Sequence, residues 1–181
     1  MITKKDLGLQ RKMVKLLEHS DNWNEYGKAT IKELQEVLGD DAIAIQHIGS
    51  TSIIGLIAKP IIDIVVGLRC LEIIDPYILE LAAKGYNYVP ARSDQDHILF
   101  ACGDYEKNTR TAYIHIVVYE SKQWKDYLAF RDILNNDEEL RKQYTWLKIH
   151  LQKKYPNDIE AYTEGKKAFI QQVLNQKLKE S

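Results

Sequence analysis

The sequence predicts an α+β fold, in which a mixed β-sheet is flanked by helices and a C-terminal helical segment packs on it. Short runs rich in Ile and Val, separated by turn formers, recur up to about residue 120. From Ser121 onward the residues are mostly helix formers, and apolar positions recur at helical spacing. Because a small sheet needs a helical cover, we expect residues 1–181 to form a single domain, with a sheet-containing part at about 1–120 and a helical part at about 121–181.

The composition excludes several classes of protein. The 25 Lys and Arg residues nearly balance the 26 Asp and Glu residues, so no overall field attracts nucleic acid or a membrane surface. No apolar stretch approaches the roughly 20 residues that span a membrane, and the N-terminus lacks the apolar core of a signal peptide. Cys70 and Cys102 are expected to be reduced and buried. These features predict a cytoplasmic protein without a membrane or nucleic-acid partner.

The N-terminal elements are predicted from periodicity and caps. Residues 1–10 form a polar lead-in, and residues 12–18 suit an edge strand or a short extended segment. Asp21 can cap a helix at about 23–38, whose apolar residues recur every three to four positions. Gly39 is expected to end this helix.

Two apolar runs then flank a polar turn. Residues 42–48 and residues 61–68 are rich in Ile and Val, and the second run has the character of a central strand covered on both faces. Between them, Gly49 lets a ligand approach the main chain, and the hydroxyls of Ser50–Ser52 can cap a short helix or hold an anion such as phosphate.

The remaining elements follow the same rules. Before the helical part we expect a helix begun by Asp75–Pro76 and stopped by Gly85, a short strand at 86–89, a loop at 90–96, and an antiparallel pair of strands at 97–102 and 111–119. In the helical part we expect helices at about 122–134, 137–154 and 158–179, with Asn136 and Asn157 as caps of the second and third.

One charged residue, Asp63, interrupts the second apolar run. A carboxylate on a buried strand costs several kcal/mol unless it is paired, hydrogen-bonded or bound to a metal. Three structural roles are open to it: accepting hydrogen bonds from the turn at 49–52, forming an ion pair with Lys59, or lying at an exposed strand end. A ligand-binding role is the fourth, because a Gly-Ser turn precedes Asp63 by about a dozen residues.

The pattern Ile48, Gly49, Ser50, then a spacer and Asp63 in an apolar strand resembles the opening of the nucleotidyltransferase-fold signature. The surrounding stretch, QHIGSTSIIGLIAKPIIDIVVGL, is similar to the GrpB family, which is assigned to that superfamily. Later blocks also resemble this family: AYIHIVV, WKDYLAFRDIL, YTWLKIHLQKKYPND and AYTEGKKAFI. The resemblance therefore covers nearly the whole chain and implies a nucleotidyltransferase-like fold.

One position departs from the superfamily pattern. Nucleotidyltransferases usually carry a second acid two residues after the first, which places both carboxylates on one strand face to share a divalent metal. Here that position is Val65, which cannot bind a metal. Either another residue completes the site or the site does not catalyse nucleotidyl transfer.

The resemblance and the residue types together predict a site around Asp63. His115 matches the neighbouring-strand block, so Asp63 and His115 are expected to be catalytic and to bind a divalent metal, Mg²⁺ or Mn²⁺ ahead of Zn²⁺, with His47 and His97 as further candidate ligands. The expected phosphate-binding residues are Gly49, Ser50, Thr51, Lys59, Arg131, Lys148, Tyr162 and Lys166.

The cationic residues have structural alternatives. Arg131 could pair with Asp126, Lys166 could lie near Glu164, and the histidines could be core residues satisfied by hydrogen bonds. The expected ligand is a nucleotide or another phosphate-bearing molecule, including one related to coenzyme A, because some domains that resemble this family are fused to dephospho-coenzyme A kinase. The expected activity is metal-dependent nucleotidyl transfer, and the alternatives are a catalytically inactive binding or regulatory module and a hydrolase with a His-bound transition metal.

Overall fold

The structure is a computed structural model that describes residues 7–104 and 106–177. Its helices are α1 (Asp21–Leu38), α2 (Ile78–Ala83), α3 (Lys122–Asn136), α4 (Glu138–Lys154), α5 (Ile159–Glu164) and α6 (Lys167–Lys177). Its strands are β1 (Leu9–Gln10), β2 (Ala44–Ile48), β3 (Ile62–Leu68), β4 (Asn87–Tyr88), β5 (Ile98–Cys102), β6 (Thr109–Arg110) and β7 (Ala112–Val118). Short 3-10 helices lie at Gly39–Asp41, Ser50–Ser52, Leu71–Tyr77 and Pro90–Arg92.

The main sheet is mixed, as predicted. Its strand order is β2-β3-β7-β5-β4, with β3 and β7 parallel and the remaining neighbours antiparallel. In the parallel pair, Asp63 lies opposite Tyr113 and Val65 lies opposite His115. A second sheet of two strands joins β1 to β6. Within residues 103–110, which were predicted to be a connecting loop, the structure therefore also contains β6.

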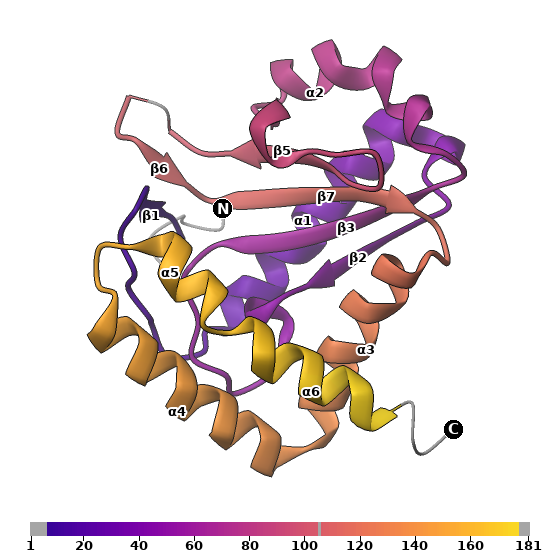
Figure 1. Ribbon diagram of the computed structural model, residues 1–181. Coiled ribbons are helices and arrows are strands. Elements are labelled where there is room, and N and C mark those ends of the chain that lie inside the picture. Colours follow the sequence, from indigo (N-terminus) through magenta and orange to yellow (C-terminus); the bar gives the residue numbers. More distant parts are fainter. Residues whose placement is uncertain (1–6, 105, 178–181) are drawn as a thin grey trace.

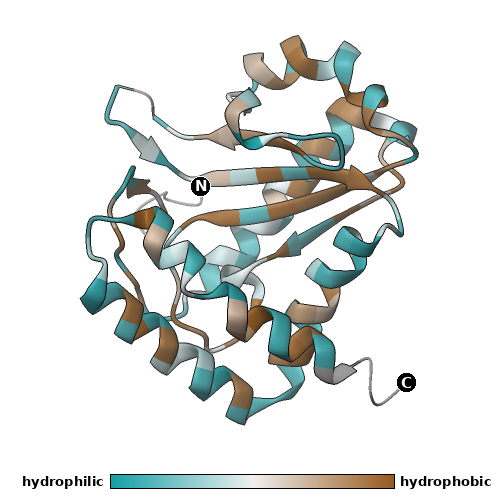
Figure 2. Ribbon diagram, viewed as in Figure 1, coloured by the Kyte–Doolittle hydropathy of each residue, from teal (hydrophilic) through white to brown (hydrophobic). Residues whose placement is uncertain are grey.

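The two faces of the main sheet carry different cores (Figure 1). Ile62, Ile64 and Val66 pack on one face with residues of α1. Val65 packs on the opposite face with Trp124 of α3. Because side chains alternate along a strand, Asp63 faces the same side as Val65, toward the C-terminal helices. Figure 2 shows that β3 and β7 are mostly hydrophobic, as expected for strands that are covered on both faces.

The C-terminal helices also cover the segment between β2 and β3. Ile53 and Leu56 of this segment form a third cluster with Leu134 of α3 and Tyr144 of α4, and Phe169 of α6 packs against it. The polar turn at 49–52 is thereby held between the end of β2 and the helical layer, next to Asp63 (Figure 1).

Several local predictions are wrong at the helix ends. Asp21 is inside α1, and Ser20 is its N-cap. Asp137 and Asp158 cap α4 and α5 in place of Asn136 and Asn157, with the side-chain oxygens accepting hydrogen bonds from the N–H of Leu140 and of Ala161. In each case the Asp that follows the predicted Asn is the N-cap, because its carboxylate also interacts favourably with the positive end of the helix dipole.

Two predicted helices are divided. The helix expected from Asp75–Pro76 starts earlier, as the 3-10 helix Leu71–Tyr77, and continues as α2. The helix expected at 158–179 is broken into α5 and α6 near Gly165. A Cβ at Gly165 would meet a methyl group of Leu151 at 2.5 Å, so only glycine permits this close crossing with α4. The part of that helix beyond residue 177 lies outside the described residues.

Two further expectations meet a mixed outcome. Residues 12–18 form no regular strand: Lys12 lies in a turn with φ 71°, and Leu17 makes a single bridge to Ala58. Cys102 is half-buried and Cys70 is exposed, so the prediction that both thiols are buried is wrong for Cys70. Both cysteines are free thiols. Along the described residues, no helix is both long and apolar enough to cross a membrane.

Candidate functional site

The turn after β2 brings the main chain against the carboxylate of Asp63. Gly49 has φ 71°, a conformation that disfavours residues with a side chain. A Cβ at this position would meet Oδ2 of Asp63 at 2.6 Å, so glycine is required both for the backbone angle and for the close approach. Ser52 donates a hydrogen bond from its hydroxyl to the carbonyl of Gly49 at 2.7 Å and closes the turn. Ser50 is half-buried, and its side chain is hydrogen-bonded to Tyr144.

Thr51 and His47 hold this turn in place. Thr51 is 1% exposed, and its hydroxyl donates to the carbonyl of Ile61 and lies 2.9 Å from Nε2 of His47. The His47 ring packs against Gly27 of α1, where a Cβ would meet Nδ1 at 2.5 Å. Burial lowers the pKa of His47 to about 4, so its ring is neutral at pH 7. The structure gives both residues structural contacts and places the His47 ring on the α1 side of the sheet, away from Asp63.

Asp63 belongs to a chain of polar side chains that runs from β3 across β7 to His97, the residue before β5. Its Oδ1 lies 3.5 Å from Nε2 of His115, and Nδ1 of His115 lies 2.9 Å from Nε2 of His97. The hydroxyl of Tyr127 on α3 also approaches Nδ1 of His115, at 3.4 Å. Burial and then the neighbouring His115 lower the pKa of His97 to about 4. Asp63 and His115 are thus brought together as predicted, and His97 lies behind His115.

The structural roles open to Asp63 are only partly realised. Its side chain is 30% exposed, so it is neither fully buried nor at a solvated strand end. Within the described ranges, its ion-pair partner is His115. Burial lowers the pKa of Lys59, and the Asp63 charge partly offsets that shift without a direct ion pair.

A divalent metal fits this pair but finds no third ligand of the usual kind. Within residues 7–104 and 106–177, no group of three or more His, Cys, Asp or Glu side chains is arranged to hold a metal. Val65 is fully buried against Ile48, Val117 and Trp124, so the position of the usual second acid belongs to the core. The 3.5 Å between Asp63 and His115 compares with roughly 3 Å between adjacent ligands of an octahedral ion with bonds of about 2.1 Å. A Mg²⁺ or Mn²⁺ ion here would complete its shell with water and ligand oxygens.

Three lysines from distant segments converge beside the turn. The amine of Lys148 is 4.8 Å from the ring centroid of Tyr144 and donates to the carbonyl of Ile57. The amines of Lys59 and Lys166 lie 5.5 and 4.7 Å from the ring centroid of Tyr162. Because Tyr144 also contacts Ser50, the lysine cluster (Lys59, Lys148 and Lys166) is connected to the turn.

The charges of the lysine cluster are poorly compensated. Burial lowers the pKa of all three amines, to about 7 for Lys166 and well below the usual range for Lys148. Repulsion adds to burial, because Lys59 acts on Lys166 and both act on Lys148. Asp63 is the acid that offsets the charges of Lys59 and Lys166. An anionic ligand would relieve this repulsion.

Arg131 is connected to the part of β2 that precedes the turn. It donates to the side chain of Gln46 and to the carbonyl of His47, both at 3.1 Å, and pairs with Asp132 at 2.7 Å. It therefore fastens α3 to the sheet. The ion pairs that the sequence suggested for the cations are wrong in detail, because Asp126 pairs with Lys122 and Glu164 pairs with Lys167.

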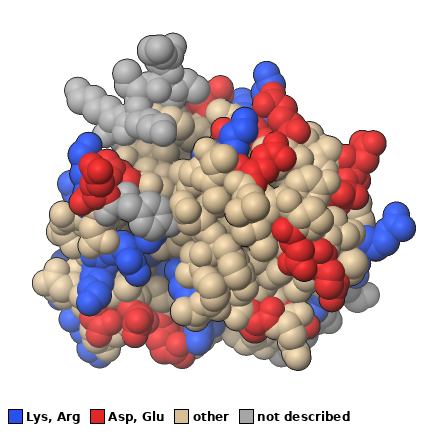
Figure 3. Space-filling model, turned by 90° about the horizontal axis from the view of Figure 1, so that it is seen from above, with Lys and Arg blue, Asp and Glu red and all other residues tan. Residues whose placement is uncertain are grey.

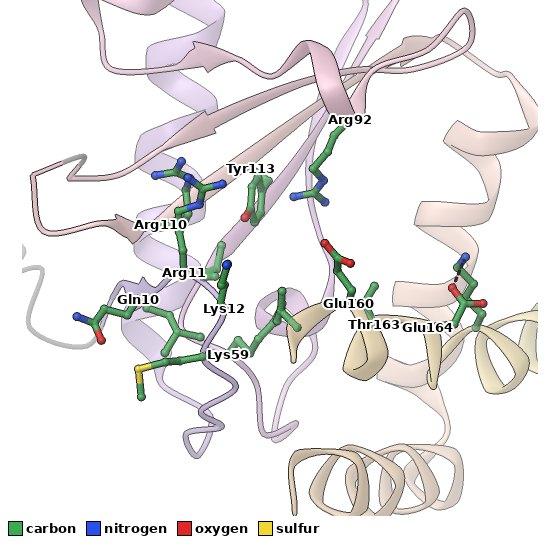
Figure 4. A pocket seen from close by; sticks show the side chains of 15 residues that line it. Gln10, Arg11, Lys12, Lys59, Arg92, Arg110, Tyr113, Glu160, Thr163 and Glu164 are labelled. Atoms are coloured by element: carbon green, nitrogen blue, oxygen red, sulfur yellow. Dashed lines mark ion pairs between the residues drawn. The ribbon is translucent and has the colours of Figure 1, made fainter. Parts of the chain in front are cut away.

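A cavity of about 410 Å³ opens next to Lys59, and sequence reasoning missed it (Figure 4). Its cationic walls come from Arg11, Lys12, Lys59, Arg92, Arg110 and Lys167, and its acids are Glu160 and Glu164. Tyr113 also lines it and is stacked under the Arg92 guanidinium, 4.9 Å from the ring centroid. The two-residue spacing of Tyr113 and His115 places both on one face of β7 and could have indicated Tyr113. No sequence signal indicated Arg92, because it lies in a short 3-10 helix within the connection from β4 to β5.

Comparisons with known proteins agree with this architecture. The family model described as GrpB protein matches residues 13–176. The Glutamate-rich protein GrpB of Alkalihalophilus pseudofirmus is 36% identical over 172 residues, which cover 94% of this chain and 99% of that protein. The crystal structure of the conserved protein GrpB from Enterococcus faecalis aligns with a TM-score of 0.83 at 29% identity, covering 92% of this chain and 98% of that one.

A more distant likeness concerns the fold alone. The Cid1 poly(U) polymerase with bound MgGTP aligns with a TM-score of 0.53 at 16% identity, over 75% of this chain and 44% of that chain. At this identity the likeness shows the fold alone, which is nucleotidyltransferase-like, as the Gly49, Ser50 and Asp63 pattern predicted. The extent of the family match and the likeness to GrpB proteins of known sequence and structure settle the family: this chain belongs to the GrpB family.

Proposed function

We propose that this protein binds a nucleotide, or a coenzyme A-related molecule with similar phosphates, on the sheet face that carries Asp63. The observation that supports this most strongly is the lysine cluster. Three amines whose pKa values are lowered by burial lie together, repulsion between the amines lowers the pKa of Lys148 and Lys166 further, and the Asp63 charge partly offsets the shift at Lys59 and Lys166. Such an arrangement destabilises the free protein and becomes favourable when a polyanion binds.

The phosphates would bind between the turn and the lysine cluster. Gly49 has no side chain to block the approach to the main chain, and the Ser50 hydroxyl lies beside Tyr144 at the edge of the cluster. Lys59 and Lys166 would present their amines directly. Lys148 is almost fully buried and bound to the Ile57 carbonyl, so it would contribute its charge from behind.

The activity proposed for this site is metal-dependent nucleotidyl transfer. A hydroxyl oxygen of the acceptor bonds to the α-phosphorus while the bond from that phosphorus to pyrophosphate breaks, and the hydroxyl proton leaves to a base. Asp63 and His115 would hold a divalent ion, which when bound polarises the α-phosphate. His115 would help to hold that ion or would take the proton, and His97 would orient the His115 ring through the 2.9 Å contact between the imidazoles.

A second candidate function is a binding or regulatory module without turnover. The buried Val65 favours it, because the carboxylate that most nucleotidyltransferases use as second metal ligand is replaced by a side chain packed under Trp124. Phosphate binding by the lysine cluster does not depend on that carboxylate. The two candidates therefore differ in their dependence on a metal.

A thermal-shift panel separates the two candidates. Wild-type and Asp63→Asn proteins are melted with each of the four nucleoside triphosphates, dephospho-coenzyme A and 4′-phosphopantetheine, in Mg²⁺, Mn²⁺ or chelator. A ligand at 100 times its Kd adds about 2.7 kcal/mol, which is roughly 5–11 °C for a chain of this size. A metal-dependent shift that Asp63→Asn abolishes supports nucleotidyl transfer, and an equal shift in chelator supports the binding module. No shift with any of these ligands contradicts both.

A further inference from the structure

The cavity beside Lys59 carries an unusual excess of positive charge. Six Lys and Arg side chains line it against two Glu side chains, and Glu164 is already paired with Lys167 at 2.6 Å. Across residues 7–104 and 106–177, no acid forms an ion pair with Arg11, Lys12, Lys59 or Arg92. Figure 4 shows Arg11 and Arg110 on one side of Tyr113 and Arg92 on the opposite side.

The charge is local rather than a property of the whole surface. The chain as a whole has a formal net charge of −1. Seen from above, Lys and Arg side chains gather toward the left of the molecule, interspersed there with Asp and Glu, and Asp and Glu predominate on the right (Figure 3). A cluster in which cations outnumber acids raises the free energy of the folded protein, and binding an anion there lowers it.

The backbone that presents two of these cations is strained. Lys12 has φ 71°, a left-handed conformation that is unfavourable for a residue with a side chain. The segment is held in this conformation by the Arg11 N–H, which donates to the Asn108 carbonyl at 2.9 Å, and by the pairing of β1 with β6. Strain that the surrounding structure enforces is typical of functional sites.

The cavity lies beside the proposed phosphate site and is distinct from it. Tyr113 on its wall is the register partner of Asp63 on β3. Lys59 lines the cavity and also belongs to the lysine cluster, whereas Lys148 and Lys166 are not among the cavity residues. Lys59 therefore lies between the two sites, and a molecule in the cavity would contact Tyr113, the strand neighbour of Asp63.

We propose that this cavity is the site of the second substrate, a small phosphorylated molecule whose phosphate binds Arg92, Lys12 and Arg11 and whose hydroxyl points toward Asp63. The assignment of that molecule as an acceptor rests on the proposed nucleotidyl transfer, but its binding does not. A volume of about 410 Å³ is within the range of small-molecule sites and suits a ligand of metabolite size. Glu160 on the opposite wall would accept a hydrogen bond from a further hydroxyl of the ligand. A nucleic-acid strand fits less well, because the cations converge on one cavity and do not form a track.

The test uses inorganic phosphate as the probe and the melting temperature of the full chain as the readout, with potassium chloride at equal ionic strength as the salt control. We expect phosphate to stabilise wild-type protein, and Arg92→Gln to raise the apparent Kd about tenfold, as for a lost hydrogen bond to a charged group. Arg69→Gln is the matched control, because Arg69 is exposed and lies outside the cavity. Lys12→Gly removes a cation while relieving the positive φ, so it should weaken phosphate binding at a melting temperature no lower than that of the wild type.

The variants distinguish phosphate binding in the cavity from nucleotide binding at the lysine cluster. If Arg92→Gln and Lys12→Gly bind phosphate as tightly as Arg69→Gln does, the cavity is not a phosphate site. If these variants weaken phosphate but Lys166→Met does not, and no nucleotide binds, the cavity stands and the nucleotide site falls. If an oligouridylate displaces phosphate with a salt dependence of several ion pairs, the cavity belongs to a nucleic-acid surface, and the small-molecule assignment is overturned.

Discussion

Removing the charge of Lys166 should make the free protein more stable while it destroys ligand binding. Burial is the main reason that the pKa of Lys166 falls from 10.5 to about 7, and repulsion by Lys59 adds to it. In the unfolded chain the amine regains its ordinary pKa. Between pH 7 and pH 10.5 the unfolded state therefore binds more protons than the folded state, and stability rises with pH. The cost of this lysine is fully present below pH 7 and disappears above about pH 10.5.

The size of the effect follows from that pKa difference. One unit corresponds to about 1.4 kcal/mol, so the full shift would be worth up to about 5 kcal/mol. The side chain is half-buried rather than fully buried, and solvent screens part of the cost. We expect Lys166→Met, which keeps an apolar chain against the Tyr162 ring, to gain about 1–2 kcal/mol at pH 7. For a chain of this size that raises the melting temperature by about 2–8 °C.

Thermal melts at pH 6.5, 8 and 9.5 measure this prediction, with Lys167→Met as the control. Lys167 is exposed and pairs with Glu164, so its replacement should change stability by less than about 1 kcal/mol. The advantage of Lys166→Met should shrink as the pH rises, and its affinity for nucleoside triphosphates should fall at least tenfold. A variant that is less stable than wild type at pH 6.5, or one that keeps its nucleotide affinity, would refute the reasoning about the lysine cluster.

Three further changes test the architecture of the site. Gly49→Ala places a methyl group 2.6 Å from the Asp63 carboxylate at φ 71°, so a denaturant melt should show that the free energy of unfolding falls by about 1–3 kcal/mol. Any metal-dependent thermal shift with ligand should also be lost, and a stable variant that still binds metal contradicts the close packing. Val65→Asp restores the usual second acid but buries an unpaired carboxylate in a core position, so urea melts should show a loss of at least about 3 kcal/mol and no new metal affinity. The pKa of His47 is about 4 in the folded protein and near 6.5 when unfolded, so stability should fall as pH drops from 6.5 to 4, and His47→Gln should flatten that slope; a slope identical to wild type would show that another group causes it.

The sequence was most informative for β2 and β3, where the alternation of side chains along a strand determines which face each residue occupies. The Ile and Val runs at 42–48 and 61–68 predict β2 and β3, and the two-residue alternation puts Asp63 on the face that the C-terminal helices cover. The family resemblance implied that His115 lies on a strand next to Asp63, and the structure places the two side chains 3.5 Å apart. The phosphate-binding and metal-binding roles of these residues stay predictions.

The rest of the site depends on packing that no local pattern records. Lys59, Lys148 and Lys166 come from three distant segments, and their common environment arises only when α4 and α5 fold over the segment before β3. Arg92 lies in the connection between β4 and β5, and Lys12 lies in the turn after β1. Tertiary contacts determine the paths of both segments and enforce the strained φ angle at Lys12. For Thr51, a local pattern was misleading. Its place in a polar turn indicated a ligand contact, whereas its hydroxyl contacts His47 and the carbonyl of Ile61 within the fold.

The proposed nucleotidyl transfer requires Asp63 to hold a divalent ion beside the phosphates of the ligand. We would titrate Mn²⁺ into wild-type and Asp63→Asn proteins and follow free Mn²⁺ by electron paramagnetic resonance, with and without saturating nucleoside triphosphate. We predict that each wild-type chain binds about one Mn²⁺ and that nucleotide raises the affinity for this ion. Asp63→Asn should bind Mn²⁺ at least tenfold more weakly. Equal Mn²⁺ binding by the two proteins, with nucleotide present, would contradict it.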